Sequence, residues 1–269
     1  MEKDRLDNIL VARGITESRE RARGMILAGK ILVNEQRCDK PGTKFNPEIA
    51  IRCLGSDLAY VSRGGLKLEK AIQVFTLDLK EKTILDIGAS TGGFTDCALQ
   101  NGASRVVALD VGYGQLAWKL RIDPRVTVFE RTNIRYFTRE QLPDSMPVDF
   151  ITCDVAFISL LLVLPVIHTL LKADGEAVLL IKPQFEAGKD KVGKRGVVKD
   201  PTVHFEVINR VLTAAAAQGL SAQGLSFSPI TGPEGNIEYL LYLHFTNTEP
   251  VISETEVRQT IEQASSKLG

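Results

Sequence analysis

The sequence predicts an α/β protein in which a small N-terminal α/β domain precedes a doubly wound, mostly parallel sheet. From about residue 66 onward, short apolar segments alternate with helical stretches, the order expected of parallel strands joined by crossover helices. Before residue 58 the elements are shorter, and a stretch rich in Pro, Gly and Asn interrupts them. The expected division is residues 1–58 for the small domain, 59–64 for a linker and 65–269 for the larger domain.

The composition is that of an ordinary globular protein. The 33 basic side chains balance the 33 acidic ones, so net charge argues neither for nor against a polyanionic partner. The four cysteines include no Cys-x-x-Cys pair, so neither a metal site nor a disulfide framework is expected. No apolar stretch approaches the roughly 20 residues of a membrane span, and the charged N-terminus does not lead into a signal peptide. We therefore expect a cytoplasmic protein without a membrane partner.

The N-terminal domain is expected to hold two helices followed by two short strands. Apolar residues at positions 6, 9 and 10 and a glycine stop predict a short first helix. Thr16 is the expected N-cap of the second helix. Strands are expected at residues 31–33 and 49–52, on either side of the Pro- and Gly-rich stretch.

In the larger domain the expected elements alternate regularly. The strands are expected at residues 83–87, 105–110, 126–129, 148–153, 176–181, 222–227 and 239–245, and the main helices at 66–75, 95–101, 160–171 and 201–218. The last two strands are joined without an evident helix, so we expect the final strand to run antiparallel.

Two segments concentrate basic side chains that suit contacts with phosphate groups. One is the second helix of the N-terminal domain with the turn after it. The other is the loop at residues 182–199, which has six basic and two acidic side chains and three glycines that favour mobility. A solvated surface is the alternative explanation for both. The candidates for RNA contacts in these segments are Arg19, Arg21, Arg23, Lys30, Lys189, Lys191, Lys194 and Arg195. Arg5 and Arg63 are further candidates outside them.

A glycine-rich loop follows the first strand of the predicted sheet and leads into a helix. It reads Asp86-Ile87-Gly88-Ala89-Ser90-Thr91-Gly92-Gly93-Phe94. Its Gly-x-x-x-Gly-Gly spacing differs from the Gly-x-Gly-x-x-Gly dinucleotide fingerprint, which disfavours NAD. Asp110, which ends the next strand, suits ribose hydroxyls, and Asp86 suits the ammonium of an amino-acid tail. Together these features predict an S-adenosylmethionine site; the alternative is an ordinary strand-turn-helix with two surface acids.

Four charged side chains are expected to meet beside this loop. Asp154 and Lys182 follow two strands of the sheet, at the carboxyl edge where open parallel sheets bind ligands. An antiparallel final strand starts at the same edge, which brings Glu238 to it. Lys67, on the helix before the first strand, is expected to lie over the same cleft. The alternative is a set of separate surface ion pairs.

Such a group suits removal of a proton from a hydroxyl. Lys182 is the candidate base, oriented by Asp154 and Glu238, and Lys67 would stabilise the developing oxyanion. A lysine is a base only when it is neutral. Burial and a second ammonium lower its pKa whereas adjacent carboxylates raise it, and the sequence leaves this balance open.

Several segments carry a family resemblance. Residues 5–53 resemble the S-four-type RNA-binding module, and residues 60–246 resemble the FtsJ-like ribose methyltransferases. The chain as a whole resembles the TlyA family, whose members are described both as hemolysins and as ribosomal RNA 2′-O-methyltransferases. The matching segments are Ser18-Arg19-Glu20-Arg21-Ala22-Arg23, Ala28-Gly29-Lys30-Ile31-Leu32-Val33-Asn34, Val61-Ser62-Arg63-Gly64-Gly65, the loop from Asp86 to Phe94, Asp110-Val111-Gly112-Tyr113-Gly114-Gln115-Leu116, Glu130-Arg131-Thr132-Asn133, Phe157-Ile158-Ser159-Leu160 and Lys182-Pro183-Gln184-Phe185-Glu186.

The resemblance implies methylation of a ribose 2′-hydroxyl by a Lys-Asp-Lys-Glu tetrad, which Lys67, Asp154, Lys182 and Glu238 match. It implies S-adenosylmethionine as the cofactor, no metal, and a cytidine of 16S or 23S ribosomal RNA, or of both, as the substrate. The cofactor site then includes the glycine-rich loop with Asp110, Val111, Thr132, Asn133 and Asp154.

Three other functions stay open at this level. A membrane-damaging hemolysin would need an amphipathic or spanning segment, which is not evident. An RNA-binding module with an inactive methyltransferase fold would not bind S-adenosylmethionine. An enzyme that methylates a base would not need a lysine-centred tetrad.

Overall fold

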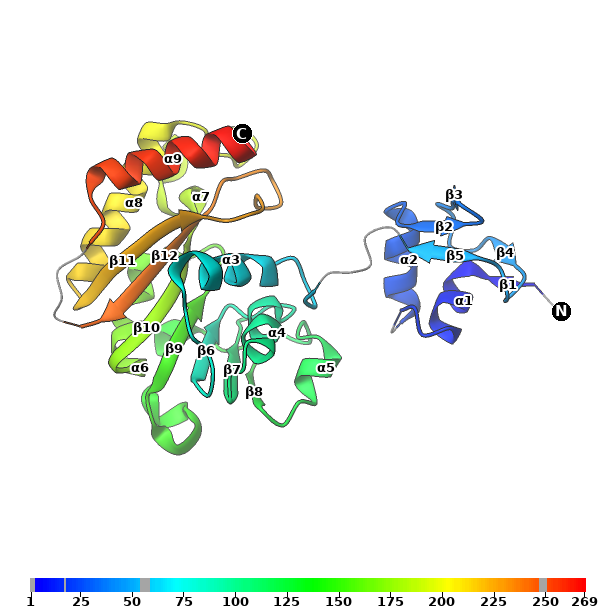
Figure 1. Cartoon of the computed structure of the whole chain (residues 1–269), viewed down its shortest axis with the longest axis horizontal. Helices are drawn as coiled ribbons and strands as arrows, with labels where there is room; N and C mark the ends of the chain where they lie inside the picture. The colour runs from blue at the N-terminus through cyan, green and yellow to red at the C-terminus, as the bar shows by residue number, and fades with distance from the viewer. Residues whose placement is uncertain (1–2, 17, 54–58, 247–250) are drawn as a thin grey trace. The chain divides into compact units, whose positions relative to one another are not determined.

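The structure is a computed structural model that describes residues 3–16, 18–53, 59–246 and 251–269. The chain divides into two compact units, residues 1–58 and 59–269 (Figure 1). The expected boundary at residue 58 lies outside the described residues. Residues 59–64, expected as a linker, group with the second unit, and Tyr60 is buried in its core.

The first unit combines two helices with two small antiparallel sheets. Strands β3, β2 and β5 form one sheet in that order, and β1 pairs with β4 in the other. Leu6 and Leu10 of the first helix pack with Ile26 of the second and Ile31 of the central strand to form its core. The elements are β1 (Asp4–Arg5), α1 (Leu6–Ala12), α2 (Arg19–Leu27), β2 (Ile31–Val33), β3 (Gln36–Arg37), β4 (Lys44–Phe45) and β5 (Ile51–Cys53).

Two details of the first unit correct the sequence-based expectations. The N-cap of α2 is Ser18 and not Thr16, because the Ser18 hydroxyl accepts a hydrogen bond from the backbone N–H of Arg21 at 3.3 Å. Thr16 is buried, and its hydroxyl donates to the Ser18 carbonyl instead. The last strand begins at Ile51 rather than at residue 49, because the N–H of Ile49 closes a turn onto the carbonyl of Asn46.

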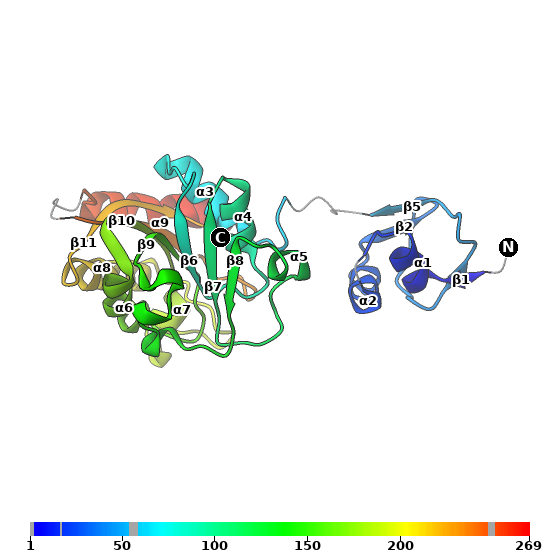
Figure 2. The ribbon, with the colours of Figure 1, turned by 90° about the horizontal axis from the view of Figure 1, so that it is seen from below.

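The second unit is a seven-stranded sheet between two layers of helices (Figure 2). Its strands are β6 (Thr83–Ile87), β7 (Arg105–Leu109), β8 (Val126–Phe129), β9 (Val148–Cys153), β10 (Leu171–Ile181), β11 (Leu220–Phe227) and β12 (Tyr239–Phe245). Its helices are α3 (Gly65–Phe75), α4 (Gly93–Gln100), α5 (Trp118–Arg121), α6 (Leu164–Leu170), α7 (Pro183–Glu186), α8 (Pro201–Ala216) and α9 (Glu254–Leu268), with short 3-10 turns between them.

The strand order is β11-β12-β10-β9-β6-β7-β8, and β12 runs antiparallel to both of its neighbours. The pairings from β10 to β8 are all parallel, so the mostly parallel sheet with an antiparallel final strand is confirmed. The chain adds β7 and β8 on one side of β6 and then returns to add β9 on the other side. The direction in which strands are added therefore reverses between β6 and β9. Ligands of open α/β sheets bind at the carboxyl edge beside such a reversal.

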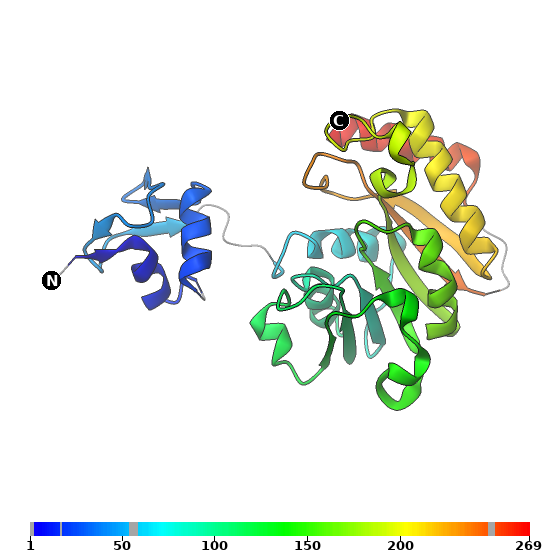
Figure 3. The same cartoon turned by 180° about the vertical axis from the view of Figure 1, so that it is seen from behind.

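Buried side chains on both faces of the sheet explain the two helical layers. Leu68 of α3 and Cys97 of α4 belong to the core on one face. Ile167 of α6, Val207 of α8 and Ile261 of α9 belong to the core on the other face. Figure 3 shows these three helices from behind. Among the described residues, no helix has the length and apolar character that crossing a bilayer requires.

Two helices of the second unit differ from expectation. The helix expected at 160–171 is a 3-10 turn at Leu160–Leu162 followed by α6, with Pro165 in its first turn, and β10 already begins at residue 171. The C-terminal helix α9 was not anticipated. Its sequence signal is a capping box in which Ser253 caps the helix and Glu256 bonds back to the Ser253 N–H.

Candidate functional site

The glycine-rich loop between β6 and α4 lies against the end of β9. Gly88 has φ +82°, and a Cβ there would lie 2.6 Å from the carbonyl oxygen of Asp154. A Cβ on Gly93 would lie 2.4 Å from the hydroxyl oxygen of Ser62. Both positions therefore require glycine for close approach of neighbouring segments, as expected of a loop that brings its backbone next to a ligand.

Asp86 lies beneath this loop and not in the cavity above it. Its side chain is 1% exposed and accepts hydrogen bonds from the hydroxyls of Thr95 at 2.6 Å and Thr152 at 2.8 Å. Burial raises the pKa of the Asp86 carboxyl to about 6. The structure thus places Asp86 as a support of the loop, whereas the sequence suggested that it holds a ligand ammonium through bound water or the backbone.

Asp110 ties the loop to the end of β7. Its carboxylate accepts hydrogen bonds from the backbone N–H groups of Ser90 at 2.8 Å and Gly112 at 2.6 Å. Each carboxylate oxygen has further lone-pair capacity. Because Asp110 also lines the cavity beside the loop, it can accept hydrogen bonds from hydroxyl groups of a ligand.

A cavity of about 950 Å³ opens at this edge of the sheet and brings together most of the residues singled out from sequence. From the expected cofactor set, Asp86, Thr91 and Gly92 do not line it. Several other residues that line the cavity were not predicted as site residues. Most of them lie in the segments 61–65, 110–116 and 157–160, whose family resemblance could have identified them. The expected residues that line the cavity are Gly88, Ala89, Ser90, Gly93, Phe94, Asp110, Val111, Thr132 and Asn133, with all four tetrad members. The unassigned ones include Ser62, Gly64, Gly112, Gln115, Arg135, Phe157, Ser159 and Pro233.

The four charged side chains of the expected tetrad meet in this cavity. Lys67 Nζ lies 3.1 Å from Asp154 Oδ2 and 2.7 Å from Glu238 Oε2. Lys182 Nζ lies 2.5 Å from Asp154 Oδ1. Asp154 is therefore shared by the two lysines. Glu238 forms its ion pair with Lys67, and no ion pair joins Glu238 to Lys182 among the described residues.

The sheet topology explains why these distant residues converge. Asp154 directly follows β9 and Lys182 directly follows β10, and these strands are parallel neighbours. Glu238 directly precedes β12, which is antiparallel to β10, so it starts where β10 ends. Lys67 comes from the first turn of α3. Three adjacent strands and one helix thus contribute the tetrad.

The charges within the tetrad favour an ionised pair at Lys67 and Asp154. Burial alone would lower the pKa of the Lys67 ammonium, but the carboxylates of Asp154 and Glu238 more than offset this and raise it above its ordinary value. Burial raises the pKa of the Asp154 carboxyl, and the two lysines outweigh that effect and lower it. Lys67 is thus held as a cation by two carboxylates, whereas Lys182 has one carboxylate partner.

Two oxygens of the tetrad keep unused capacity. Asp154 Oδ1 and Glu238 Oε2 are buried and accept no hydrogen bond of suitable geometry within the described residues, although each lies within ion-pair distance of a lysine. Each of these oxygens thus has a lysine as its partner, and a carboxylate oxygen can accept a further hydrogen bond. Together with two ammonium groups, these oxygens form a compact group that can bind a polar atom and move a proton.

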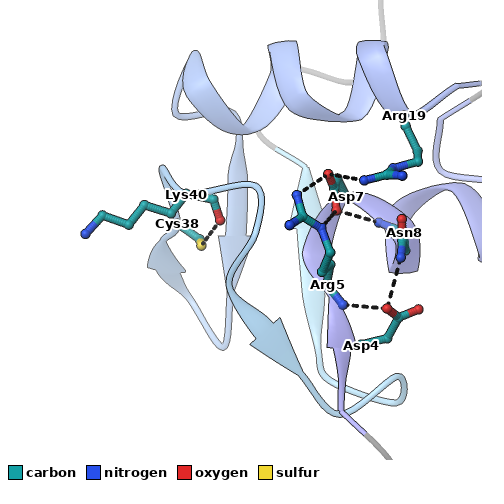
Figure 4. Close-up of polar contacts among 7 residues, drawn as sticks. All are labelled: Asp4, Arg5, Asp7, Asn8, Arg19, Cys38 and Lys40. Carbon is teal, nitrogen blue, oxygen red and sulfur yellow. Dashed lines mark hydrogen bonds and ion pairs between the residues drawn. The ribbon is translucent and has the colours of Figure 1, made fainter.

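In the first unit, two of the basic candidates are held by one buried acid (Figure 4). The Asp7 carboxylate is fully buried and pairs with Arg5 at 2.9 Å and Arg19 at 3.3 Å. These hydrogen bonds outweigh the effect of burial and lower the pKa of Asp7 to about 2. The two arginine side chains remain 41% and 57% exposed, so their outward donors stay accessible.

The other basic candidates lie mostly on the surface. In the loop after β10, Lys191 pairs with Glu206, and Lys189 lines a second cavity that adjoins the first. Arg63 does not line the larger cavity, although its two chain neighbours, Ser62 and Gly64, do. The remaining candidates are exposed; they are Arg21, Arg23, Lys30, Lys194 and Arg195.

Comparison with protein families matches both units. Residues 60–245 match the model of the FtsJ-like methyltransferases, and residues 4–48 match the S4 domain. The larger match covers more than half of the chain and includes the loop, the cavity and all four tetrad residues.

Comparison with individual proteins extends this similarity over nearly the whole chain. A Bacillus subtilis protein, YqxC, named as a candidate rRNA methyltransferase, is 52% identical over 99% of this chain and 95% of its own length. The 16S/23S rRNA (cytidine-2′-O)-methyltransferase TlyA of Mycobacterium tuberculosis is 42% identical over 98% of this chain and 97% of its own. A solved structure from Streptococcus thermophilus, described as a candidate hemolysin, has a TM-score of 0.79 at 43% identity and covers 99% of this chain and 97% of its own.

Proposed function

Because the chain belongs to the FtsJ-like methyltransferase family, we propose that it methylates the 2′-hydroxyl of a cytidine in ribosomal RNA, with S-adenosylmethionine as the methyl donor. The observation that carries this proposal is the convergence of Lys67, Asp154, Lys182 and Glu238 in one cavity beside the glycine-rich loop. A substrate in 16S RNA, 23S RNA or both places the proposed reaction on ribosomal subunits in the cytoplasm.

The donor is proposed to occupy the part of the cavity beside the loop. Asp110 and the backbone of residues 88–90 would hold its ribose and amino-acid portions, since hydroxyls and ammonium groups need acceptors. Thr132 and Asn133 line the same region. When bound, S-adenosylmethionine supplies an activated methyl group on a sulfonium.

The tetrad residues are proposed to prepare the hydroxyl oxygen. Lys182, whose Nζ has a single carboxylate partner, accepts the hydroxyl proton in its neutral amine form. Lys67, held as a cation by two carboxylates, stabilises the negative charge that develops on the oxygen. Asp154 positions the Nζ atoms of both lysines. Glu238 acts on Lys67, which revises its expected role in orienting Lys182.

The first unit is proposed to bind the RNA. Its match to the S4 domain and the accessible guanidinium groups of Arg5 and Arg19 support this role. The basic loop at residues 189–195 would add contacts near the reaction site.

The proposal is tested by incubating the full-length protein and S-adenosylmethionine with ribosomal subunits that lack the modification. The RNA is then digested to nucleosides and analysed by mass spectrometry. We expect 2′-O-methylcytidine and no base-methylated nucleoside. A methyl group on the base, or no methyl transfer to either subunit, would contradict the proposal.

A further inference from the structure

A second cavity adjoins the catalytic one and has a chemically distinct wall. Its volume is about 460 Å³, and it shares the segment 157–159 with the catalytic cavity. Its lining also includes Gln184, Phe185 and Lys189. It therefore combines an amide, aromatic rings and a cation immediately beside the tetrad.

The amide of Gln184 stands out because its Oε1 is buried and accepts no hydrogen bond from any described residue. Leaving a buried amide oxygen unpaired is unfavourable, and such atoms in folded proteins call for a specific explanation. Gln184 lies only two residues after Lys182, in the short helix α7. Its position suggests that a substrate group supplies the missing partner.

The aromatic part of the cavity is formed by two rings from different segments. The Phe157 ring centroid lies 5.1 Å from that of Phe185. Phe157 is 91% exposed and adopts φ +63°, an uncommon backbone conformation for a bulky residue. Exposed aromatic rings offer stacking surfaces for unpaired nucleobases.

Two hydrogen bonds connect the two chain segments that form the walls of this cavity. Glu186 accepts hydrogen bonds from the Ser159 hydroxyl at 2.6 Å and from the Leu160 N–H at 2.7 Å. These bonds join the segment that follows Asp154 to the segment that follows Lys182. The cavity is therefore positioned by the ends of the two strands that carry Asp154 and Lys182.

We propose that this second cavity receives the base of the nucleotide being methylated and that Gln184 reads its polar edge. This inference rests on the proposed function. A carboxamide carries an acceptor and a donor side by side, which complements the 4-amino group and N3 of cytosine. Uracil offers a donor and an acceptor in the reverse order, so an amide held in one orientation distinguishes the two bases. Gln184 is thus a specificity residue rather than part of the proton-transfer group.

The test compares subunits that carry cytidine or uridine at the methylated position, once that position has been mapped. Wild-type protein is expected to favour cytidine by about 10- to 100-fold in kcat/KM, the usual range for a bidentate base contact. In Gln184→Leu the ratio is expected to fall to about 1–3, mostly through slower reaction with cytidine. Gln184→Met, which keeps an unbranched side chain, serves as a second variant if the first folds poorly.

Gln263→Leu is the matched control, because Gln263 is exposed on α9 and lies in neither cavity. It should keep the wild-type preference. An unchanged preference in both folded Gln184 variants, or equal reaction of the wild type with both bases, overturns the inference. Absence of all methyl transfer rejects the proposed function instead; filter binding of the same subunits to wild type and variants then still tests base reading by Gln184.

Discussion

Each unit of this chain places a carboxylate between two cationic side chains, but the two arrangements differ in the kind of cation and in its exposure. In the first unit Asp7 holds Arg5 and Arg19, whose side chains are 41% and 57% exposed. In the second unit Asp154 holds Lys67 and Lys182, whose side chains are only 10% and 11% exposed. The first arrangement presents its cations to the surface, and the second encloses them in a cavity.

The choice of arginine or lysine matches this difference. Arg5 binds Asp7 through two parallel hydrogen bonds and stays charged, which leaves its remaining donors fixed for an anion. A lysine can lose its proton when its surroundings change, so an enclosed lysine suits proton transfer. The proposed function assigns RNA binding to the first cluster and proton transfer to the second, and separate mutations can test this assignment.

The largest effect is expected from Lys182→Ala. We expect methyl transfer to fall by about 10³-fold, because the proposed base is lost. The affinity for S-adenosylmethionine should stay within about threefold by calorimetry, because the loop and Asp110 are unchanged. Lys172→Ala is the matched control, since Lys172 pairs with Asp149 outside the cavity and should leave the rate unchanged. Substantial turnover by Lys182→Ala would remove Lys182 from the mechanism.

A pair of equivalent substitutions separates the two clusters. Asp154→Asn should lower kcat by about 10²-fold with little change in RNA affinity, because both lysines lose their shared counter-charge. Asp7→Asn should weaken RNA binding by about 10-fold while kcat at saturating RNA is retained, because the two arginines lose their common anchor. Filter binding and single-turnover rates measure the two quantities. Equal effects of both substitutions on kcat would refute the division of labour.

The two buried carboxyls Asp7 and Asp86 should produce opposite pH dependences of stability. The folded-state pKa of Asp86 is about 6 against an ordinary 3.8, so its contribution to stability is lost as pH rises from about 4 to 6. The folded-state pKa of Asp7 is about 2, so its contribution is present above about pH 4 and is lost as pH falls through 2.

Denaturant unfolding of wild type and Asp86→Asn over this pH range measures the first effect. The difference in unfolding free energy between wild type and Asp86→Asn should change by about 3 kcal/mol as the pH goes from 4 to 6. Below pH 4 and above pH 6 this difference should be constant. Asp149→Asn is a useful comparison, because the pKa of Asp149 is lowered rather than raised. A pH-independent difference for Asp86→Asn would show that Asp86 does not titrate in this range.

The smallest effect is expected from Arg19→Ala. Its guanidinium is exposed and shares Asp7 with Arg5, so RNA affinity should fall only a few-fold. The slope of log affinity against log salt concentration should decrease by about one, since one phosphate contact is lost. An unchanged slope would mean that Arg19 acts only within the protein.

Much of this architecture could be predicted because it depends on local pattern. Five of the seven strands of the large sheet begin within one residue of where alternating apolar segments placed them. The sequence predicted that β10 and β11 begin at residues 176 and 222, whereas they begin at Leu171 and Leu220. Their first residues precede the continuous apolar run on which the prediction depended. The N-cap of α2 was placed wrongly because Thr16 and Ser18 are both good caps, and only their hydrogen bonds distinguish them.

By itself, the sequence determined the order of elements, the glycine-rich loop and the presence of two lysines and two acids at strand ends and on α3, since chain connectivity and residue type suffice for these. The tertiary structure alone decided which charges pair: Glu238 lies against Lys67, and Asp86 faces two hydroxyls beneath the loop. It also decided that Oε1 of Gln184 accepts no hydrogen bond from the described residues. Such pairings depend on distances of a few ångströms between segments far apart in the chain, which strand order and loop path set together.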